Sequence, residues 1–295
     1  MAASWVLFAL LQPVCYAAVN LLDKFLIAKK VRNYYAYSVV LGLLALLSAI
    51  IIGLIVGFPK TTGHTLTMGI FAGGVFGLAY LNYFRMLSYA EVSRIVGVGY
   101  LYPAFVAFFS FIFLAEKLSL LKYGAILVAV MGALMIGIEN QKKRWKLTPA
   151  FWLMIGNAVL IAIVDTTDKY VLQQLNYWQV YVLITIPFAL VLMSPVLRKS
   201  VRDDLAQPVR VLPAMVLIEL FTIGGAVSFL IAASLVPVAL VSAMATLQPV
   251  IVFAAIFLMS KFVPHILKEK IAARDVGYKI AGIALVVFAT VVLSL

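Results

Sequence analysis

The sequence predicts an all-α membrane protein with ten transmembrane helices in two inverted five-helix repeats. Two observations support this fold class. First, 65% of the 295 residues are hydrophobic, only 12% are charged, and the mean hydropathy is +1.12. Soluble domains are about 45–50% apolar and about 25% charged, so lipid must be the main solvent of this chain. Second, a set of polar and glycine motifs recurs in the same order in the two halves of the sequence.

The chain contains apolar runs of the length that a membrane requires, which is roughly 20 residues for a spanning helix. The ten runs are 4–28, 34–57, 65–89, 92–115, 119–138, 149–173, 178–197, 211–235, 238–260 and 274–294. The longest polar stretches between them, at 139–148, 198–210 and 261–274, are too short for a soluble domain. The first run is not expected to be a cleaved signal peptide, because its positive charges follow it.

The internal repeat predicts the relative orientation of the two halves. The segment Asn20-Leu-Leu-Asp23-Lys24 recurs as Asp165-Thr-Thr-Asp168-Lys169, 145 residues later. Further pairs, at offsets of 143 to 151, are Asn33-Tyr-Tyr with Asn176-Tyr-Trp, Gly73-Gly74 with Gly224-Gly225, and Tyr102-Pro103 with Gln248-Pro249. Because five helices per half is an odd number, the second half must enter the membrane from the opposite side. We therefore expect a first repeat at 1–140 and a more divergent second repeat at 141–295.

The basic residues predict the topology. The net charge is +12, but Lys and Arg stand in short loops between apolar runs, so nucleic acid is not an expected partner. Sixteen basic residues fall on one side of the predicted bundle and three on the other, with four within or near helix ends. The positive-inside rule then places both termini outside the cytoplasm of a multi-pass protein of the cell membrane.

Four segments of the first half carry a family resemblance: Tyr83-Phe-Arg-Met-Leu-Ser-Tyr-Ala90-Glu-Val-Ser93, Leu101-Tyr-Pro103, Leu114-Ala-Glu116-Lys-Leu-Ser119 and Leu121-Lys-Tyr-Gly124 through Gly132. They resemble the third to fifth helices of the EamA-type ten-helix proteins of the drug/metabolite transporter superfamily. A weaker copy spans 228–261. The resemblance covers nearly the whole chain and implies secondary active transport.

The chain departs from this family in four ways. The segment Tyr37-Ser-Val-Val lacks an arginine that is common early in the second helix, and Glu116 has no counterpart at the end of the ninth. Related small exporters place a glutamate eight residues before a first-helix lysine, where this chain has Tyr16 and Ile161. Their proton-exchange mechanism therefore does not carry over residue by residue. Family members generally have cytoplasmic termini, whereas the distribution of charge in this chain predicts the reverse.

Two polar stripes and an aromatic surface are the predicted substrate-binding region. Polar residues recur every four positions on the first and sixth helices, which aligns them on one face of each helix. Pro103 and Pro249 predict kinks that would expose the carbonyl groups of Gly99 and Ala245. The predicted binding residues are Gln12, Tyr16, Asn20, Tyr80, Tyr83, Tyr100, Asn157, Asp165 and Gln248. The alternative is interhelical packing through hydrogen bonds. Asp165 favours a cavity, because carboxylates inside membranes usually have a function.

A second set of residues is predicted to couple or gate transport. It comprises Asp23, Lys24, Asp168, Lys169 and Glu219. The two Asp-Lys pairs lie near the far ends of the first and sixth helices, where the alternative is that both extend to the membrane interface. Glu219 lies about 12 Å deep in the eighth helix and is either a proton carrier or one partner of an ion pair, perhaps with Arg85. Tyr34, Tyr35, Tyr37, Tyr177, Trp178 and Tyr181 begin helices and are predicted to lie at the interface.

These patterns predict a secondary active transporter, a permease or exporter, for a small polar or amphipathic metabolite. Alternating access and proton coupling would fit it, and we expect a monomer or weak homodimer in the lipid bilayer. The alternative is a lipid-headgroup translocase or a structural membrane subunit. An enzyme is not expected, because neither a phosphate-binding glycine loop nor a nucleophile elbow is present. With one cysteine, Cys15, and two distant histidines, His64 and His265, we expect no metal and no cofactor.

Overall fold

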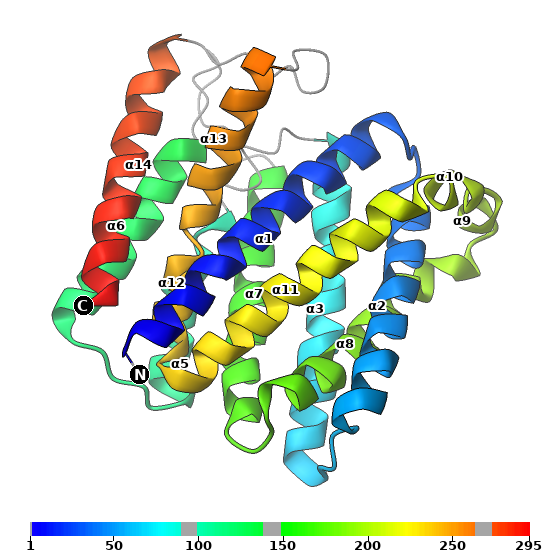
Figure 1. Ribbon diagram of the computed structural model, residues 1–295, viewed down its shortest axis with the longest axis horizontal. Coiled ribbons are helices and arrows are strands. Elements are labelled where there is room, and N and C mark those ends of the chain that lie inside the picture. Colours follow the sequence, from blue (N-terminus) through cyan, green and yellow to red (C-terminus); the bar gives the residue numbers. More distant parts are fainter. Residues whose placement is uncertain (1, 90–98, 138–148, 263–272) are drawn as a thin grey trace.

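The computed structural model describes residues 2–89, 99–137, 149–262 and 273–295, and every regular element within these ranges is a helix (Figure 1). The elements are α1 (Ala2–Lys29), α2 (Tyr34–Val56), α3 (Gly63–Tyr89), α5 (Tyr102–Phe113), α6 (Leu120–Gly137), α7 (Pro149–Leu172), α8 (Tyr177–Met193), η1 (Ser194–Leu197), α9 (Lys199–Asp203), α10 (Ala206–Val209), α11 (Leu212–Leu235), α12 (Val238–Met244), α13 (Leu247–Phe262) and α14 (Ala273–Ser294). Apart from the fourth and ninth runs, and the seventh, which comprises α8 and η1, each predicted apolar run coincides with one long helix.

Seven helical segments in the described ranges are long and apolar enough to cross a membrane. They are Ser4–Ile27, Tyr34–Val56, Gly63–Leu87, Tyr177–Leu197, Leu212–Leu235, Val238–Leu258 and Gly277–Ser294, and Tyr102–Phe113 and Leu120–Ile136 are shorter apolar helices. The fourth predicted run extends into 90–98, and the predicted repeat boundary lies in 138–148, both outside the described residues. The count of ten spans therefore stays a prediction.

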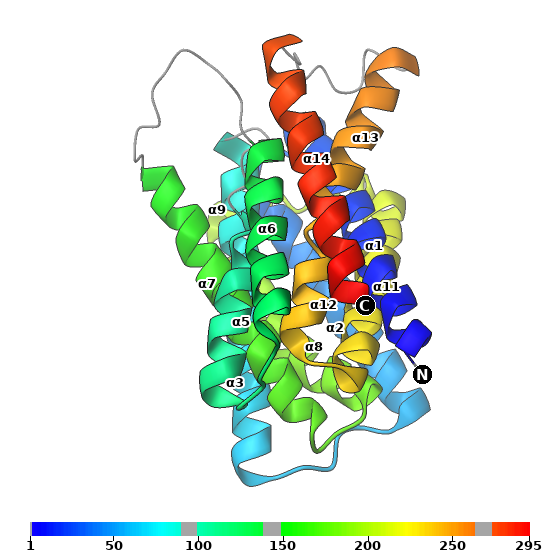
Figure 2. The same ribbon diagram turned by 90° about the vertical axis from the view of Figure 1, so that its left-hand side faces the viewer.

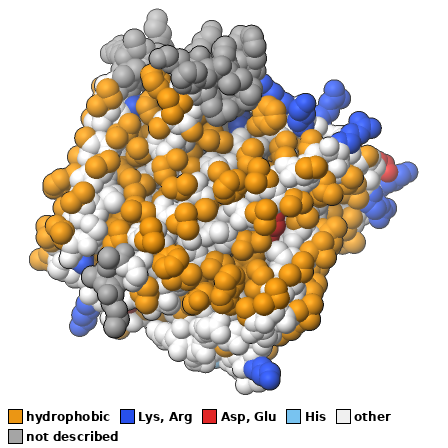
Figure 3. All heavy atoms as spheres, viewed as in Figure 1, with side chains coloured by type: hydrophobic (Ala, Val, Ile, Leu, Met, Phe, Trp, Pro, Cys, Tyr) orange, Lys and Arg blue, Asp and Glu red, His pale blue; other side chains and the backbone are white. Residues whose placement is uncertain are grey.

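The distribution of side chains is that of a protein surrounded by lipid. Large apolar residues such as Leu54 and Ile55 are more than 70% exposed, whereas Asp23 and Glu219 are buried. Figure 3 shows hydrophobic side chains over most of the visible face, with many Lys and Arg near the end where α9 and α10 lie. Part of the predicted basic set lies in 90–98, 138–148 and 263–272, outside the described residues.

The helices pack as a bundle in which close contacts join distant parts of the chain. α1 packs against α11, α6 against α14, and α8 against both α2 and α3. A Cβ on Gly73 of α3 would lie 2.2 Å from the carbonyl oxygen of Ile184, so only glycine allows α3 this close to α8. The two termini lie at one end of the bundle, and the α1–α2 connection and α9–α10 at the other (Figures 1 and 2).

The fourth and ninth runs are broken rather than kinked, which corrects the sequence prediction. α12 ends at Met244 and α13 begins at Leu247, two residues before Pro249. Proline has no N–H group for the carbonyl of Ala245. This carbonyl instead accepts a turn hydrogen bond from the Gln248 N–H at 2.9 Å. In the same way α5 begins at Tyr102, directly before Pro103, after a turn at residues 100–101.

Candidate functional site

The main candidate site is a cavity of about 210 Å³ enclosed by α1, α3, α7, α8 and α11, with the first residues of α5 and α13. All nine predicted substrate-binding residues line it: Gln12, Tyr16, Asn20, Tyr80, Tyr83, Tyr100, Asn157, Asp165 and Gln248. Asp168 from the predicted gating set also lines it. The structure therefore brings both polar stripes to one place. Whether these residues bind a substrate stays a prediction.

Three buried oxygen atoms at the cavity have no hydrogen-bond partner among the described residues. They are Oε1 of Gln12, Oδ1 of Asn157 and Oδ1 of Asp168. A buried polar atom without a partner costs free energy, so an unsatisfied one calls for an explanation such as a bound ligand or water. All three are acceptors. The cavity is therefore suited to groups that donate hydrogen bonds.

The remaining polar groups of the cavity are held in place by neighbouring helices. Asn20 of α1 accepts a hydrogen bond at 2.8 Å from the hydroxyl of Tyr83 on α3. Asp165 of α7 accepts one at 2.7 Å from the hydroxyl of Ser242 on α12. Asp165 thus ties α7 to the broken ninth run while lining the cavity. Neither Lys nor Arg is part of the described cavity lining, so the two carboxyl groups have no basic side chain beside them there.

The two lysines of the predicted gating pairs make equivalent contacts. Lys24 of α1 donates to the carbonyl oxygen of Leu87 on α3 at 3.1 Å. Lys169 of α7 donates to the carbonyl oxygen of Ala233 on α11 at 2.6 Å and to that of Val236 at 2.9 Å. The carbonyl groups in the last turn of a helix lack intrahelical partners and carry partial negative charge. Lys169 therefore stabilises the C-terminal end of α11, whose C-cap is Val236, and Lys24 ties α1 to α3.

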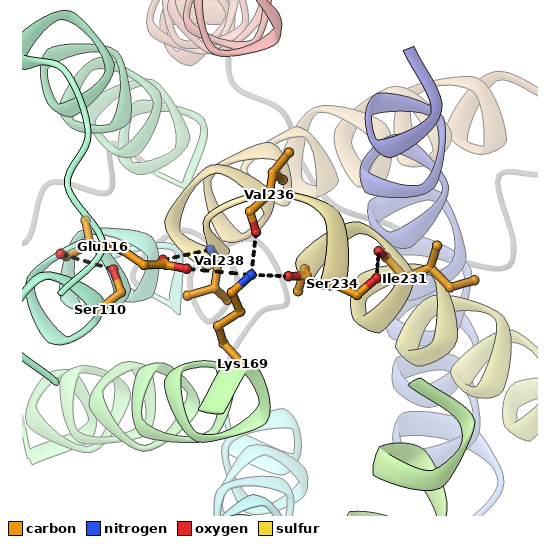
Figure 4. A network of polar contacts seen from close by, with 9 residues as sticks. Ser110, Glu116, Lys169, Ile231, Ser234, Val236 and Val238 are labelled. Atoms are coloured by element: carbon orange, nitrogen blue, oxygen red, sulfur yellow. Dashed lines mark hydrogen bonds and ion pairs between the residues drawn. The ribbon is translucent and has the colours of Figure 1, made fainter. Parts of the chain in front are cut away.

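Glu116 lies in the α5–α6 connection and Lys169 lies on α7. Both contact the α11–α12 connection (Figure 4). Their charged atoms lie 3.7 Å apart. Oε2 of Glu116 also accepts the N–H of Val238 at 3.0 Å, which satisfies a donor at the start of α12. Burial raises the pKa of Glu116 above its ordinary value, and Lys169 opposes this shift. These contacts give Glu116 a structural role at the start of α12.

Asp23 and Glu219 lie outside the cavity wall. Asp23 is fully buried and accepts a hydrogen bond from the hydroxyl of Tyr37. Glu219 of α11 accepts a hydrogen bond at 2.8 Å from Ser48 of α2. Arg85, suggested from the sequence as an ionic partner of Glu219, is exposed and lines a separate pocket near Arg198. The hydrogen-bond partner of Glu219 is thus a neutral hydroxyl, which corrects that suggestion.

Two tyrosines predicted at the membrane interface are buried instead. Tyr37 is 0% exposed and Tyr181 is 4% exposed. Tyr181 lines the cavity, and its hydroxyl lies 3.0 Å from the Ser48 hydroxyl. Thr185, one turn further along α8, also lines the cavity and was missed. The spacing of Tyr181 and Thr185 by four residues in an otherwise apolar helix was the signal that would have found both.

Comparison with known proteins finds a family match over the first half of the chain. The model of the EamA-like transporter family matches residues 3–138. This part of the chain is similar to that family. The family is part of the drug/metabolite transporter superfamily, so the resemblance inferred from the sequence is confirmed. The EamA-like match indicates a membrane transporter of the drug/metabolite type.

A solved structure, described only as the crystal structure of a protein, shares the fold. It aligns with a TM-score of 0.65 and 16% sequence identity over 96% of this chain and 95% of that chain. No curated protein matches the chain.

Proposed function

We propose that this EamA-like protein is a secondary active transporter for a small amphipathic metabolite that carries hydrogen-bond donors, most simply an organic amine. The observation that supports this most directly is the set of three unsatisfied acceptors, on Gln12, Asn157 and Asp168, around one cavity. A bound ammonium or hydroxyl group would supply the missing donors. A carboxylate or phosphate would leave them unsatisfied and would meet Asp165 and Asp168.

The aromatic side chains of the cavity support a substrate with positive charge. Tyr16, Tyr80, Tyr83 and Tyr100 line the wall beside the two carboxyl groups. The face of an aromatic ring attracts a cation, and a desolvated contact of this kind contributes about 2 kcal/mol. Rings and carboxylates together therefore favour an amine over a neutral sugar of similar size.

Alternating access is supported by packing that is preserved when the two halves are exchanged. α1 packs on α11 and α7 packs on α3, so the first helix of each predicted half contacts the third helix of the other. The bonds of Lys24 to Leu87 and of Lys169 to Ala233 repeat within each half. We infer a pseudo-two-fold axis in the membrane plane, which is the architecture of many secondary transporters.

Coupling to protons is proposed through Glu219. The cavity connects to this carboxyl group through Tyr181 and Ser48, whose hydroxyl groups lie 3.0 Å apart. Ser48 then donates to Glu219 at 2.8 Å. A carboxyl group at membrane depth is a common proton relay in transporters.

A thermal-shift screen on the purified full-length protein tests the proposed substrate class. A ligand that binds the folded state raises the melting temperature by mass action. Small aromatic and aliphatic amines are compared with their carboxylate and neutral analogues of the same size. We expect amines to raise the melting temperature of the wild type and to raise that of Asp165→Asn less. A response confined to anionic compounds would overturn the proposal.

A further inference from the structure

A second pocket, of about 490 Å³, lies apart from the cavity and shares none of its described lining residues. It is formed by the start of α2, the last turns of α3 and the η1 segment that follows α8. Its polar lining residues are Tyr35, Asn82, Arg85, Ser194 and Arg198. The pocket therefore lies at the end of three membrane helices, on the side of the bundle where α9 and α10 lie (Figure 1).

Two arginines, Arg85 and Arg198, line this pocket together with the ring of Tyr35. The Arg198 guanidinium carbon lies 5.1 Å from the ring centroid of Tyr35. Arg85 lines the same pocket, so both positive charges act on one small volume. No carboxylate stands among the described lining residues. Arginine presents a fork of donors that matches phosphate oxygens, and such a pair of arginines favours a phosphate-type anion.

The border of the pocket is apolar and exposed on the side that faces lipid. Leu81 and Leu197 line the pocket, and Leu197 is 81% exposed. About one turn toward the middle of the membrane, Leu78 of α3 and Leu190 of α8 are each 55% exposed. They stand four residues before Asn82 and Ser194, which line the pocket on the same two helical segments. An acyl chain attached to the anion would therefore have apolar surface beneath it, which a free soluble anion does not need.

We propose that this pocket binds the headgroup phosphate of an anionic phospholipid between Arg85 and Arg198, with the acyl chains along Leu78 and Leu190. Basic pockets between membrane helices bind anionic headgroups, because the charge and the adjoining hydrocarbon surface are recognised together. The bound lipid would be a regulatory or structural partner, distinct from the transported metabolite.

The test measures lipid binding directly and does not depend on transport. The full-length protein in neutral detergent is titrated with dioleoyl phosphatidylglycerol or dioleoyl phosphatidylcholine, and bound lipids are counted by native mass spectrometry. We expect phosphatidylglycerol to bind and phosphatidylcholine to bind weakly. Each of Arg85→Ala and Arg198→Ala should weaken phosphatidylglycerol binding about fivefold, since one basic residue near an anionic surface contributes about that factor.

Controls separate this site from general charge effects. Arg202→Ala removes an exposed arginine at the same end of the bundle but outside the pocket, and should leave binding unchanged. Inorganic phosphate and glycerol phosphate serve as competing soluble anions. Equal loss of binding in Arg202→Ala, or equal binding of phosphatidylcholine, would overturn the proposal. Full displacement of the lipid by millimolar inorganic phosphate would assign the pocket to a soluble anion instead.

Discussion

Gly132 on α6 and Gly282 on α14 lie directly against each other's backbone. A Cβ on Gly132 would lie 2.7 Å from the carbonyl oxygen of Gly282, and a Cβ on Gly282 would lie 2.6 Å from that of Gly132. The contact joins the last helices of the two predicted halves. Small residues allow helix backbones to approach in membranes, where van der Waals packing replaces the hydrophobic driving force.

Gly132→Val is expected to destabilise the protein by about 1–3 kcal/mol, because the added carbons force α6 and α14 apart. The melting temperature in detergent measures the effect. Gly124→Val is the matched control, since a Cβ on Gly124 of the same helix meets nothing within 4 Å. Equal melting temperatures for Gly132→Val and the control would show that the close approach does not contribute to stability.

The sequence predicts the helices of this protein better than it predicts their interruptions. The run 34–57 matches α2 and the run 211–235 matches α11 within a residue, because hydropathy changes sharply at both ends. Asn33 caps α2 by accepting hydrogen bonds from the N–H groups of Tyr35 and Ala36. Pro249 in contrast was interpreted as a kink. The residue type shows that the carbonyl of Ala245 loses its helical bond, but not that it accepts a turn bond from Gln248 instead.

The cavity was predictable where the two halves repeat each other and less so elsewhere. The four-residue spacing of Gln12, Tyr16 and Asn20 placed one wall correctly. Tyr181 was assigned to the interface because it lies near the start of an apolar helix. Tertiary packing of α8 against α2 and α3 decides its burial, and this packing cannot be inferred from position in the helix.

Asp165→Asn is expected to reduce transport by at least about tenfold, because a cationic substrate binds more weakly when it loses a charged hydrogen-bond partner. The protein should remain folded, because the asparagine oxygen can still accept the Ser242 hydroxyl, which lies at 2.7 Å in the wild type. Flux of an amine identified by thermal shift is measured in reconstituted vesicles. Asp203→Asn, at an exposed position on α9, is the control. Wild-type flux from Asp165→Asn would restrict this residue to a packing role.

Glu116→Gln is expected to change how stability depends on pH. Burial holds the pKa of Glu116 above its ordinary value, so the folded state binds this proton more tightly than the unfolded state. The contribution of Glu116 to stability is therefore complete at low pH and is lost as pH rises through the raised pKa. The difference in melting temperature between wild type and Glu116→Gln should decrease over that interval.

Lys169→Met should make this pH dependence steeper, because Lys169 opposes the rise in the pKa of Glu116. Lys117→Met removes an exposed neighbour and should leave the dependence unchanged. The measurement is again the melting temperature across a pH series. A variant Lys169→Met with the wild-type pH profile would mean that the 3.7 Å ion pair does not form in the membrane protein.

A reporter fused after Leu295 is expected to lie outside the cytoplasm, because most basic loop residues belong to the opposite side of the predicted bundle. A second reporter inserted within α9 should lie in the cytoplasm, since α9 and the C-terminus are at opposite ends (Figure 1). Alkaline phosphatase and fluorescent fusions give complementary signals for the two locations. A cytoplasmic C-terminus with an external α9 would reverse the proposed orientation and restore the topology usual for the family.

Glu219→Gln is expected to abolish the response of transport to a pH gradient while preserving substrate exchange at equal pH. The glutamine oxygen can still accept the Ser48 hydroxyl, so the contact between α11 and α2 should survive. Ser48→Ala retains the carboxyl group but interrupts the path from Tyr181, and should weaken the response in part. Vesicle flux with and without a pH gradient measures both effects.

Thr222→Ala distinguishes a proton path from a general disturbance of α11. Its hydroxyl donates to the carbonyl oxygen of Ile218 within the helix, one turn from Glu219, so the path through Ser48 and Tyr181 stays intact. This variant should respond to the gradient as the wild type does. If Glu219→Gln still responds fully and melts normally, then Glu219 is not the coupling group. If Glu219→Gln melts early and Thr222→Ala does not, the hydrogen bond between Ser48 and Glu219 serves mainly to hold α2 against α11.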